Sequence, residues 1–267
     1  MGKSIMMNRI TQKLRERDKR KLLIPFFTVG FPDLRSSLDL VKVAVDCGAD
    51  LVELGMPFSD PLADGPEIQL SSAAALRNGV NLKKILNAVK TIRSHSEVPL
   101  ILMGYYNPIL AYGEERFLAD ASKAGVDGLI IPDLPVEEAG SIKRAADAQN
   151  LSTIFLVAPT STTDRIRRIE QMSSDFVYAV TVTGVTGARK GFSTATETYL
   201  AKLSWLLHKP FVAGFGVSSP ESARRLVCYS DGVVIGSALV RTISNARAKW
   251  LYLKQVGRCL SSIKDAI

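Results

Sequence analysis

Eight short apolar runs separated by helix-like segments are the feature that most limits how this chain can fold. Runs of this length, bounded by glycine, proline or polar residues, are typical of strands buried in a parallel sheet. Their alternation with helical segments predicts a parallel α/β fold, and the count of eight favours closure into a (β/α)8 barrel, although a doubly wound sheet would alternate in the same way. The expected strands lie at residues 22–28, 51–54, 99–104, 128–131, 152–157, 176–182, 211–213 and 232–235.

The length of the chain fits a single domain of this kind. Its 267 residues are close to the roughly 250 that are typical of such barrels, and no change in composition marks a boundary, so we expect one domain over residues 1–267. Residues 4–18 are amphipathic and predict an extra N-terminal helix that plugs the bottom of the barrel. We expect residues 136–149 to form a helix and the last helix to begin at or soon after Ser237.

The second apolar run contains a charged residue. Glu53 stands between Val52 and Leu54, where a buried strand requires apolar side chains. An ionised carboxylate held out of water costs several kcal/mol unless it is paired or protonated, so burial should raise the pKa of Glu53 toward neutral pH. Such a group suits general acid/base catalysis, and a salt bridge to a neighbouring strand is the alternative interpretation.

An acidic loop follows this strand. Three prolines between residues 57 and 66 prevent a helix or strand from forming before residue 66 and stiffen the loop that carries Asp64. Asp-Pro pairs are ordinary turn formers, so these residues alone are weak evidence of function. A glutamate at a strand end with an aspartate eleven residues later nevertheless favours a catalytic pair, Glu53 and Asp64, over chance loop composition.

Glycine-rich segments follow the last three predicted strands. In (β/α)8 barrels the loops after strands seven and eight commonly hold phosphate, because glycine lets backbone N–H groups approach an anion and a helix start adds a partial positive charge. Residues 214–219 and Gly236-Ser237 occupy these positions and together favour a phosphate site, although each alone is ordinary turn chemistry. Residues 214–219 lack the third glycine of a dinucleotide-binding fingerprint. Residues 184–191 are a candidate lid.

Several classes of site are disfavoured by composition. His95 and His208 are the only histidines, so neither a Ser-His triad nor a histidine-rich metal site is expected. None of the predicted strands contains lysine, which removes the nucleophile of a Schiff-base aldolase. The three cysteines include no Cys-x-x-Cys pair, so the sequence predicts no disulfide framework and fits a reducing cytoplasm.

The net charge of +8 permits attraction to nucleic acid or to an anionic substrate. The basic stretches 13–21 and 241–264 do not interleave aromatic residues in the manner of single-strand binders, so a solvated surface is expected and nucleic-acid binding is the weakest hypothesis. The N-terminus does not resemble a signal peptide, and no uninterrupted apolar run approaches 18 residues, so no membrane association is expected.

Residues 53–69, with the sequence ELGMPFSDPLADGPEIQ, closely resemble the signature of the tryptophan synthase alpha chain family. A run of this length with matching spacing is highly specific. The resemblance covers nearly the whole chain and favours the closed barrel over the doubly wound sheet. Further matching segments are residues 24–26, 105–108, 132–135, 183–189, 214–216 and 236–237.

The resemblance implies cleavage of indole-3-glycerol phosphate into indole and glyceraldehyde 3-phosphate, with no cofactor and no metal in this subunit. Glu53 would protonate the indole carbon that bears the side chain and accept the glycerol hydroxyl proton, while Asp64 would hold the indole N–H. Tyr105 would pack beside Glu53, and Thr186 would lock the lid against Asp64. The implied phosphate ligands are Gly187, Gly216, Gly236 and Ser237. The implied indole pocket consists of Phe26, Met103, Ile130, Ile154, Tyr178 and Phe215.

The resemblance also implies a partner. Alpha chains of this family pair with a beta chain that carries pyridoxal phosphate and receives indole through a tunnel, in an alpha-beta-beta-alpha heterotetramer. The acidic loop and the segment from Asp133 would be the docking surfaces. The alternative function is a weakly active or inactive subunit that activates the beta chain. Another phosphate-binding barrel, such as an isomerase of the same pathway, is disfavoured by the length of the matched acidic loop.

Overall fold

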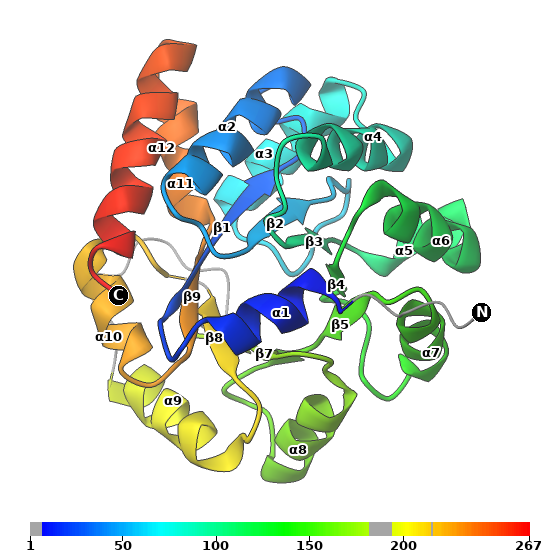
Figure 1. Cartoon of the computed structure of the whole chain (residues 1–267), viewed down its shortest axis with the longest axis vertical. Helices are drawn as coiled ribbons and strands as arrows, with labels where there is room; N and C mark the ends of the chain where they lie inside the picture. Colours follow the sequence, from blue (N-terminus) through cyan, green and yellow to red (C-terminus); the bar gives the residue numbers. More distant parts are fainter. Residues whose placement is uncertain (1–6, 182–193, 215) are drawn as a thin grey trace.

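The computed structural model describes residues 7–181, 194–214 and 216–267, and within them the chain forms a parallel α/β barrel (Figure 1). Nine strands form one sheet in the order β5-β4-β3-β2-β1-β9-β8-β7-β6, and every neighbouring pair is parallel. The strands are β1 (Leu22–Thr28), β2 (Val52–Gly55), β3 (Leu100–Met103), β4 (Gly128–Ile130), β5 (Ser152–Ile154), β6 (Leu156–Val157), β7 (Val177–Val180), β8 (Phe211–Gly214) and β9 (Gly232–Ile235).

Helices surround the sheet, and Figure 1 views the barrel from the end that α1 covers. The described helices are α1 (Arg9–Glu16), α2 (Leu34–Asp46), α3 (Pro66–Arg77), α4 (Leu82–Arg93), α5 (Tyr106–Tyr112), α6 (Glu114–Ala124), α7 (Gly140–Ala148), α8 (Thr163–Met172), α9 (Thr194–Leu206), α10 (Pro220–Val227), α11 (Ser237–Asn245) and α12 (Lys249–Lys264). The predicted barrel with an extra N-terminal helix is confirmed.

The predicted fifth strand is divided in two. Phe155 separates β5, which pairs with β4, from β6, which pairs with β7. The two ends of the sheet order are therefore consecutive along the chain, so the sheet closes on itself. Serine hydroxyls span the division: Ser173 Oγ accepts a hydrogen bond from the Phe155 N–H (3.2 Å) and Ser174 Oγ from the Thr153 N–H (3.0 Å).

Helix α5 was not expected, and it tolerates Pro108 because this residue lies in the first helical turn, where no backbone N–H is needed. Two expectations about helices were wrong in part. The helix expected from residue 136 begins only at Gly140, after a turn in which the Glu138 N–H donates to the Pro135 carbonyl (3.0 Å). A helix begins at Ser237 as expected, but it ends at Asn245 and α12 follows it, because Ala246 and Ala248 take extended conformations.

The extra helix at the bottom of the barrel is shorter than expected, and an ion pair between side chains holds it in place. Within the described residues it begins after Asn8, whose side chain accepts the Ile10 N–H, and it ends before Asp18, which has a left-handed φ of 45°. Ile10 is fully buried in the barrel interior. Lys13 pairs with Asp50 (3.1 Å), an aspartate just before β2 whose carboxylate also accepts the Leu23 N–H.

The core has two layers because side chains alternate along each strand. Outward-facing residues such as Val52 and Leu54 pack against the helices, in one large cluster. Leu51, just before β2, and inward-facing residues of the neighbouring strands fill the barrel, with Ile10 at the bottom. Glu53 stands at the next inward position of β2 after Leu51, so the interior layer includes one carboxylate from this strand.

Candidate active site at the carboxyl ends of the strands

Glu53 is held inside the barrel by its strand neighbours. Its backbone is in register with Phe26 on β1 and with Ile101 on β3, and its side chain has no exposed surface. Neither carboxylate oxygen has a hydrogen-bond partner among the described residues. Burial raises the pKa of Glu53 to about 8, because the charged form has lost its hydration without gaining a partner. The carboxyl group is therefore protonated at neutral pH and can donate a proton.

Asp64 is placed by the acidic loop. The Tyr105 hydroxyl accepts the Ala63 N–H (2.9 Å), and the Gln69 side-chain amide donates to the Asp64 carbonyl (2.9 Å). The loop ends where Pro66 occupies the first position of α3, which suits its fixed φ. Burial raises the pKa of Asp64 to about 6, and interaction with the Tyr105 hydroxyl opposes that shift. Asp64 is thus ionised at neutral pH while Glu53 is protonated.

Tyr178 on β7 faces both carboxylates across the barrel. Its pKa is raised well above the ordinary value, first by burial and then by the negative charges of Glu53 and Asp64. Its ring lies against Gly214 on β8, where a Cβ atom would overlap the Tyr178 hydroxyl. Gly214 is therefore needed to leave room for this ring, a requirement that the sequence did not reveal.

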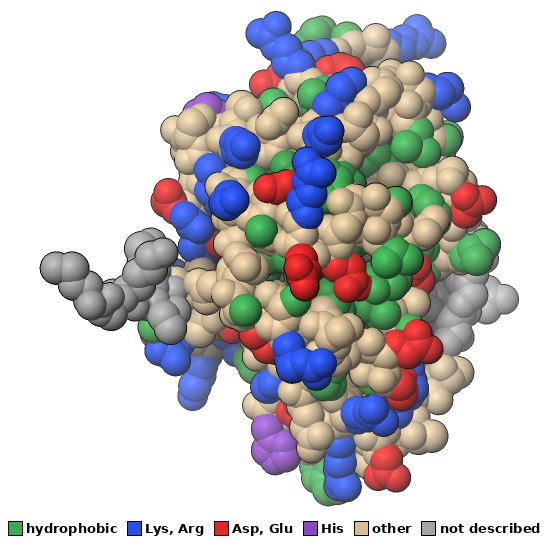
Figure 2. Space-filling model, turned by 90° about the vertical axis from the view of Figure 1, so that its right-hand side faces the viewer, with side chains coloured by type: hydrophobic (Ala, Val, Ile, Leu, Met, Phe, Trp, Pro, Cys, Tyr) green, Lys and Arg blue, Asp and Glu red, His purple; other side chains and the backbone are tan. Residues whose placement is uncertain are grey.

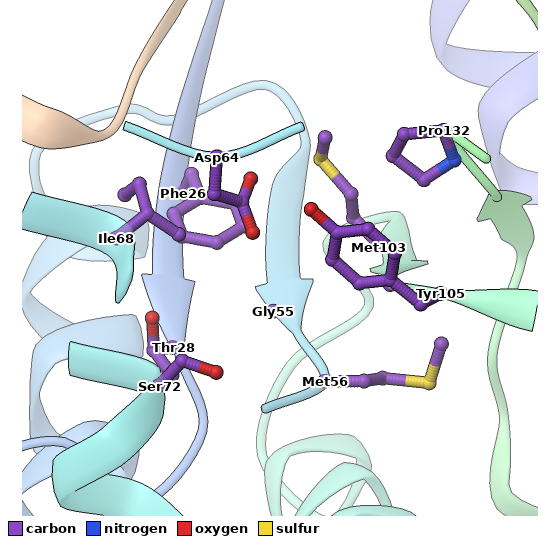
Figure 3. Close-up of a pocket in the computed structure, with 11 residues that line it drawn as sticks. Phe26, Thr28, Gly55, Met56, Asp64, Ile68, Ser72, Met103, Tyr105 and Pro132 are labelled. Atoms are coloured by element: carbon purple, nitrogen blue, oxygen red, sulfur yellow. The ribbon is translucent and has the colours of Figure 1, made fainter. Parts of the chain in front are cut away.

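A small pocket opens at the barrel rim, and Asp64 is the one acid among its lining residues (Figure 3). The Asp64 carboxylate and the Tyr105 hydroxyl both point into it, while Phe26 and Met103, predicted for the indole site, form its walls. Gly55 leaves room for the Phe26 ring, because a Cβ there would overlap that ring. The lining residues that sequence reasoning missed are Thr28, Gly55, Met56, Ile68, Ser72, Gly104 and Pro132.

The other predicted pocket residues lie deeper. Ile130, Ile154 and Tyr178 belong to the same interior cluster as Phe26 and Met103, and all three are buried. Tyr105, expected beside Glu53, contacts the acidic loop: its hydroxyl accepts a hydrogen bond from the Ala63 N–H, and its ring centroid lies 5.2 Å from that of Phe58. Phe215 lies outside the described residues, as do Thr186, Gly187 and the whole predicted lid at residues 184–191.

The described residues of the predicted phosphate site lie at two strand ends. Gly216 follows β8 with a left-handed φ of +89°, a conformation that glycine adopts without strain. Gly236 follows β9 as the N-cap of α11, with no side chain capping the helix, and Ser237 is the first helical residue. The exposed backbone N–H groups and the positive end of the helix dipole suit an anion.

Other site types find little support in the described residues. No group of three or more His, Cys, Asp or Glu side chains in this part of the chain could hold a metal ion. None of the described helices combines the length and the apolar character needed to cross a membrane. On the face in Figure 2, Lys and Arg side chains are scattered among Asp and Glu and do not gather into one basic patch.

This fold and geometry are typical of (β/α)8 barrel enzymes, whose active sites lie at the carboxyl ends of the strands. The chain matches the family model of the tryptophan synthase alpha chain over residues 12–267. The tryptophan synthase alpha chain of Geobacter sulfurreducens is 48% identical over 250 residues, which is 94% of this chain and 94% of that protein. This chain therefore belongs to the tryptophan synthase alpha chain family.

Solved structures agree with this assignment. The crystal structure of tryptophan synthase subunit alpha from Legionella pneumophila matches with a TM-score of 0.90 at 35% identity, covering 98% of each chain. A structure of the tryptophan synthase a2b2 complex from Pyrococcus furiosus matches with a TM-score of 0.85 at 38% identity, covering 91% of this chain and 98% of that chain.

Proposed function

We propose that this chain cleaves indole-3-glycerol phosphate into indole and glyceraldehyde 3-phosphate. The observation that carries this proposal is Glu53, a fully buried carboxyl group without a hydrogen-bond partner in the described residues and with its pKa raised to about 8. An unpartnered buried carboxyl destabilises the fold, so its presence at the carboxyl end of a barrel strand fits a chemical role better than a structural one.

Glu53 performs two proton transfers in the proposed reaction. The protonated carboxyl group first donates its proton to the indole carbon that bears the glycerol chain, and the ring becomes cationic. The resulting carboxylate then accepts the proton of the adjacent glycerol hydroxyl. As that proton leaves, the carbon–carbon bond breaks, its electron pair returns to the indole ring and the hydroxyl oxygen becomes the aldehyde oxygen. Glu53 ends protonated, as it began.

Asp64 supplies the complementary charge. With a pKa of about 6 it is ionised at neutral pH and accepts a hydrogen bond from the indole N–H, which stabilises the positive charge that develops on the ring. The apolar walls formed by Phe26 and Met103 suit the indole rings. Gly216, Gly236 and Ser237 would bind the phosphate through backbone N–H groups, together with Gly187.

The proposed partner is a tryptophan synthase beta chain, which would carry pyridoxal phosphate and receive the indole. The Pyrococcus furiosus structure is described as an a2b2 complex, and a similar assembly here is supported by exposed apolar side chains near the site. Leu62 in the acidic loop is 90% exposed and Leu110 on α5 is 55% exposed. The N-terminus of α5 is tied to Asp133, because the Tyr106 N–H donates to its carboxylate (2.9 Å).

The test is indole release from indole-3-glycerol phosphate, with and without a beta chain, for wild type and Glu53→Gln. We expect kcat to fall by about 10²- to 10⁴-fold in the variant, because its amide cannot transfer protons. Glu97→Gln, at an exposed glutamate beside the bottom of the barrel, is the matched control and should retain full activity. If the wild-type chain released no indole but still stimulated the beta chain, the lyase proposal would be refuted in favour of the alternative, a subunit that activates the beta chain.

A further inference from the structure

Helices α3 and α11 meet at the mouth of the barrel and are joined by an ion pair. Arg241 Nη2 on α11 lies 3.0 Å from Glu67 Oε1 on α3. These two helices come from opposite ends of the sequence and begin at the two halves of the proposed site. Helix α3 follows Asp64 directly, and α11 begins at Ser237.

The Glu67 end of the pair is connected to the indole half of the site. Glu67 lies in the first turn of α3, where a negative charge is favoured by the helix dipole. Its neighbour Ile68 lines the pocket, and Gln69 donates a hydrogen bond to the Asp64 carbonyl (2.9 Å). A movement of this helical turn would therefore carry Asp64 and Ile68 with it.

The Arg241 end is connected to the phosphate half. Arg241 lies one helical turn after Ser237, on the helix whose uncapped N-terminus faces the proposed phosphate site. The start of this helix is packed closely against the pocket wall, because a Cβ at Gly236 would lie 3.3 Å from Phe26 Cβ. A shift of α11 would therefore move the phosphate site relative to the pocket.

We propose that Glu67 and Arg241 are positioning residues that fix the separation between the indole-binding and phosphate-binding halves of the site. The inference rests on the proposed function, because it needs one ligand that occupies both halves. The ion pair touches neither half directly, so its loss would change the relative placement of two intact half-sites. It should therefore affect ligands that span both halves and spare ligands that occupy only one.

The expected effect is modest. The side chains of Arg241 and Glu67 are 48% and 29% exposed, and ion pairs that remain in contact with water change an equilibrium constant by about two- to fivefold. A spanning ligand should therefore bind about two- to fivefold more weakly when the pair is broken. A purely structural role would weaken all ligands alike or lower only the thermal stability.

The experiment measures dissociation constants of three probes for wild type, Glu67→Gln and Arg241→Gln. Inorganic phosphate occupies one half, indole the other, and a non-cleavable analogue with a saturated three-carbon chain between indole and phosphate spans both. We expect weaker analogue binding in both variants, with phosphate and indole unchanged. Asp39→Asn is the matched control, since it breaks the Asp39–Lys249 pair between α2 and α12, whose side chains are similarly exposed (43% and 42%).

A double variant, Glu67→Gln with Arg241→Gln, should bind the analogue no more weakly than either single variant, because each removes the same ion pair. Arg241→Lys keeps the charge and should recover part of the affinity. Unchanged analogue binding, or equal weakening of all three probes, would overturn the positioning role. Wild type that failed to bind the analogue would instead refute the proposed function, and the positioning role with it.

Discussion

The two ends of the barrel treat buried carboxylates in opposite ways. At the bottom, Asp127 is 3% exposed and is surrounded by partners: Arg93, Arg9 (3.1 Å) and the Leu100 N–H (2.8 Å). At the top, Glu53 is wholly buried and has no partner among the described residues. Both groups have lost water, so the difference lies in what replaces it. Partners turn a buried acid into a structural connection, and their absence leaves a proton available for chemistry.

The same division extends to other acids at the two ends. Asp50 binds Lys13 and Lys264 and so connects the first and last helices, and Asp231 binds Arg17 (2.8 Å). At the top, Asp64 is held by a hydrogen bond to its backbone carbonyl. Among the described side chains, the Tyr105 hydroxyl is the group that lowers the pKa of its carboxyl group. The bottom is therefore suited to stability and the top to reaction, as expected for this fold.

The largest expected effect on stability is at the bottom. Asp127→Ala leaves the guanidinium of Arg93, which is 10% exposed, without its carboxylate, so the free energy of unfolding should fall by about 3–5 kcal/mol. Urea unfolding measures this, with Glu115→Gln, at an exposed glutamate on α6, as control. The kcat of the protein that remains folded should stay near the wild-type value. A loss of stability below about 1 kcal/mol would contradict the contrast between the two ends.

An effect of similar size and opposite sign is expected at the top. The pKa of Glu53 is about 8 in the folded chain and 4.5 as the ordinary value, so the folded form binds the extra proton between these pH values. Stability therefore falls as pH rises from about 4.5 through about 8.

Glu53→Gln removes this dependence. Relative to wild type, the variant should gain about 4 kcal/mol in free energy of unfolding between pH 4 and pH 8.5. Urea unfolding at several pH values tests this, with Glu115→Gln again as reference. A constant difference between wild type and variant across that range would show that Glu53 is not the source of the linkage.

The smallest effect concerns the rate. Asp64 must be ionised and Glu53 protonated, so kcat/KM should be highest between the two pKa values of about 6 and about 8. Below this window Asp64 gains a proton, above it Glu53 loses one, and activity should fall about tenfold per pH unit on each side. Glu53→Gln would abolish most of the activity and, with it, the decrease of kcat/KM at alkaline pH. Asp64→Asn should remove only the decrease at acid pH from the activity that remains.

The barrel was predictable from the sequence because short apolar runs directly indicate buried strands. It could not predict the division at Phe155, since all six residues of that run are equally suited to one strand and only the neighbours on each side separate β5 from β6. Helix α5 was missed because its 7 residues contain a proline, and a short helix depends on packing more than on local preference.

The site was predictable to a similar extent. Glu53 was found because a carboxylate interrupts an apolar strand, and Asp64 because prolines order its loop. The need for Gly214 beside Tyr178 depends on the pairing of β7 with β8. The relation of both acids to Tyr178 depends on closure of the barrel, which brings β7 opposite β2. No local pattern records a contact between residues more than one hundred positions apart in the chain.

The alternation of side chains along β2 has a consequence for how such a chain can diverge. Loops at the barrel rim can absorb insertions of any length, but a single residue inserted between Leu51 and Glu53 would turn the carboxyl group outward into the helix layer. Two inserted residues would return it to the interior at a new height. Insertions or deletions in this strand that keep the carboxyl group inside the barrel must therefore change its length by an even number of residues, whatever residues occupy its other positions.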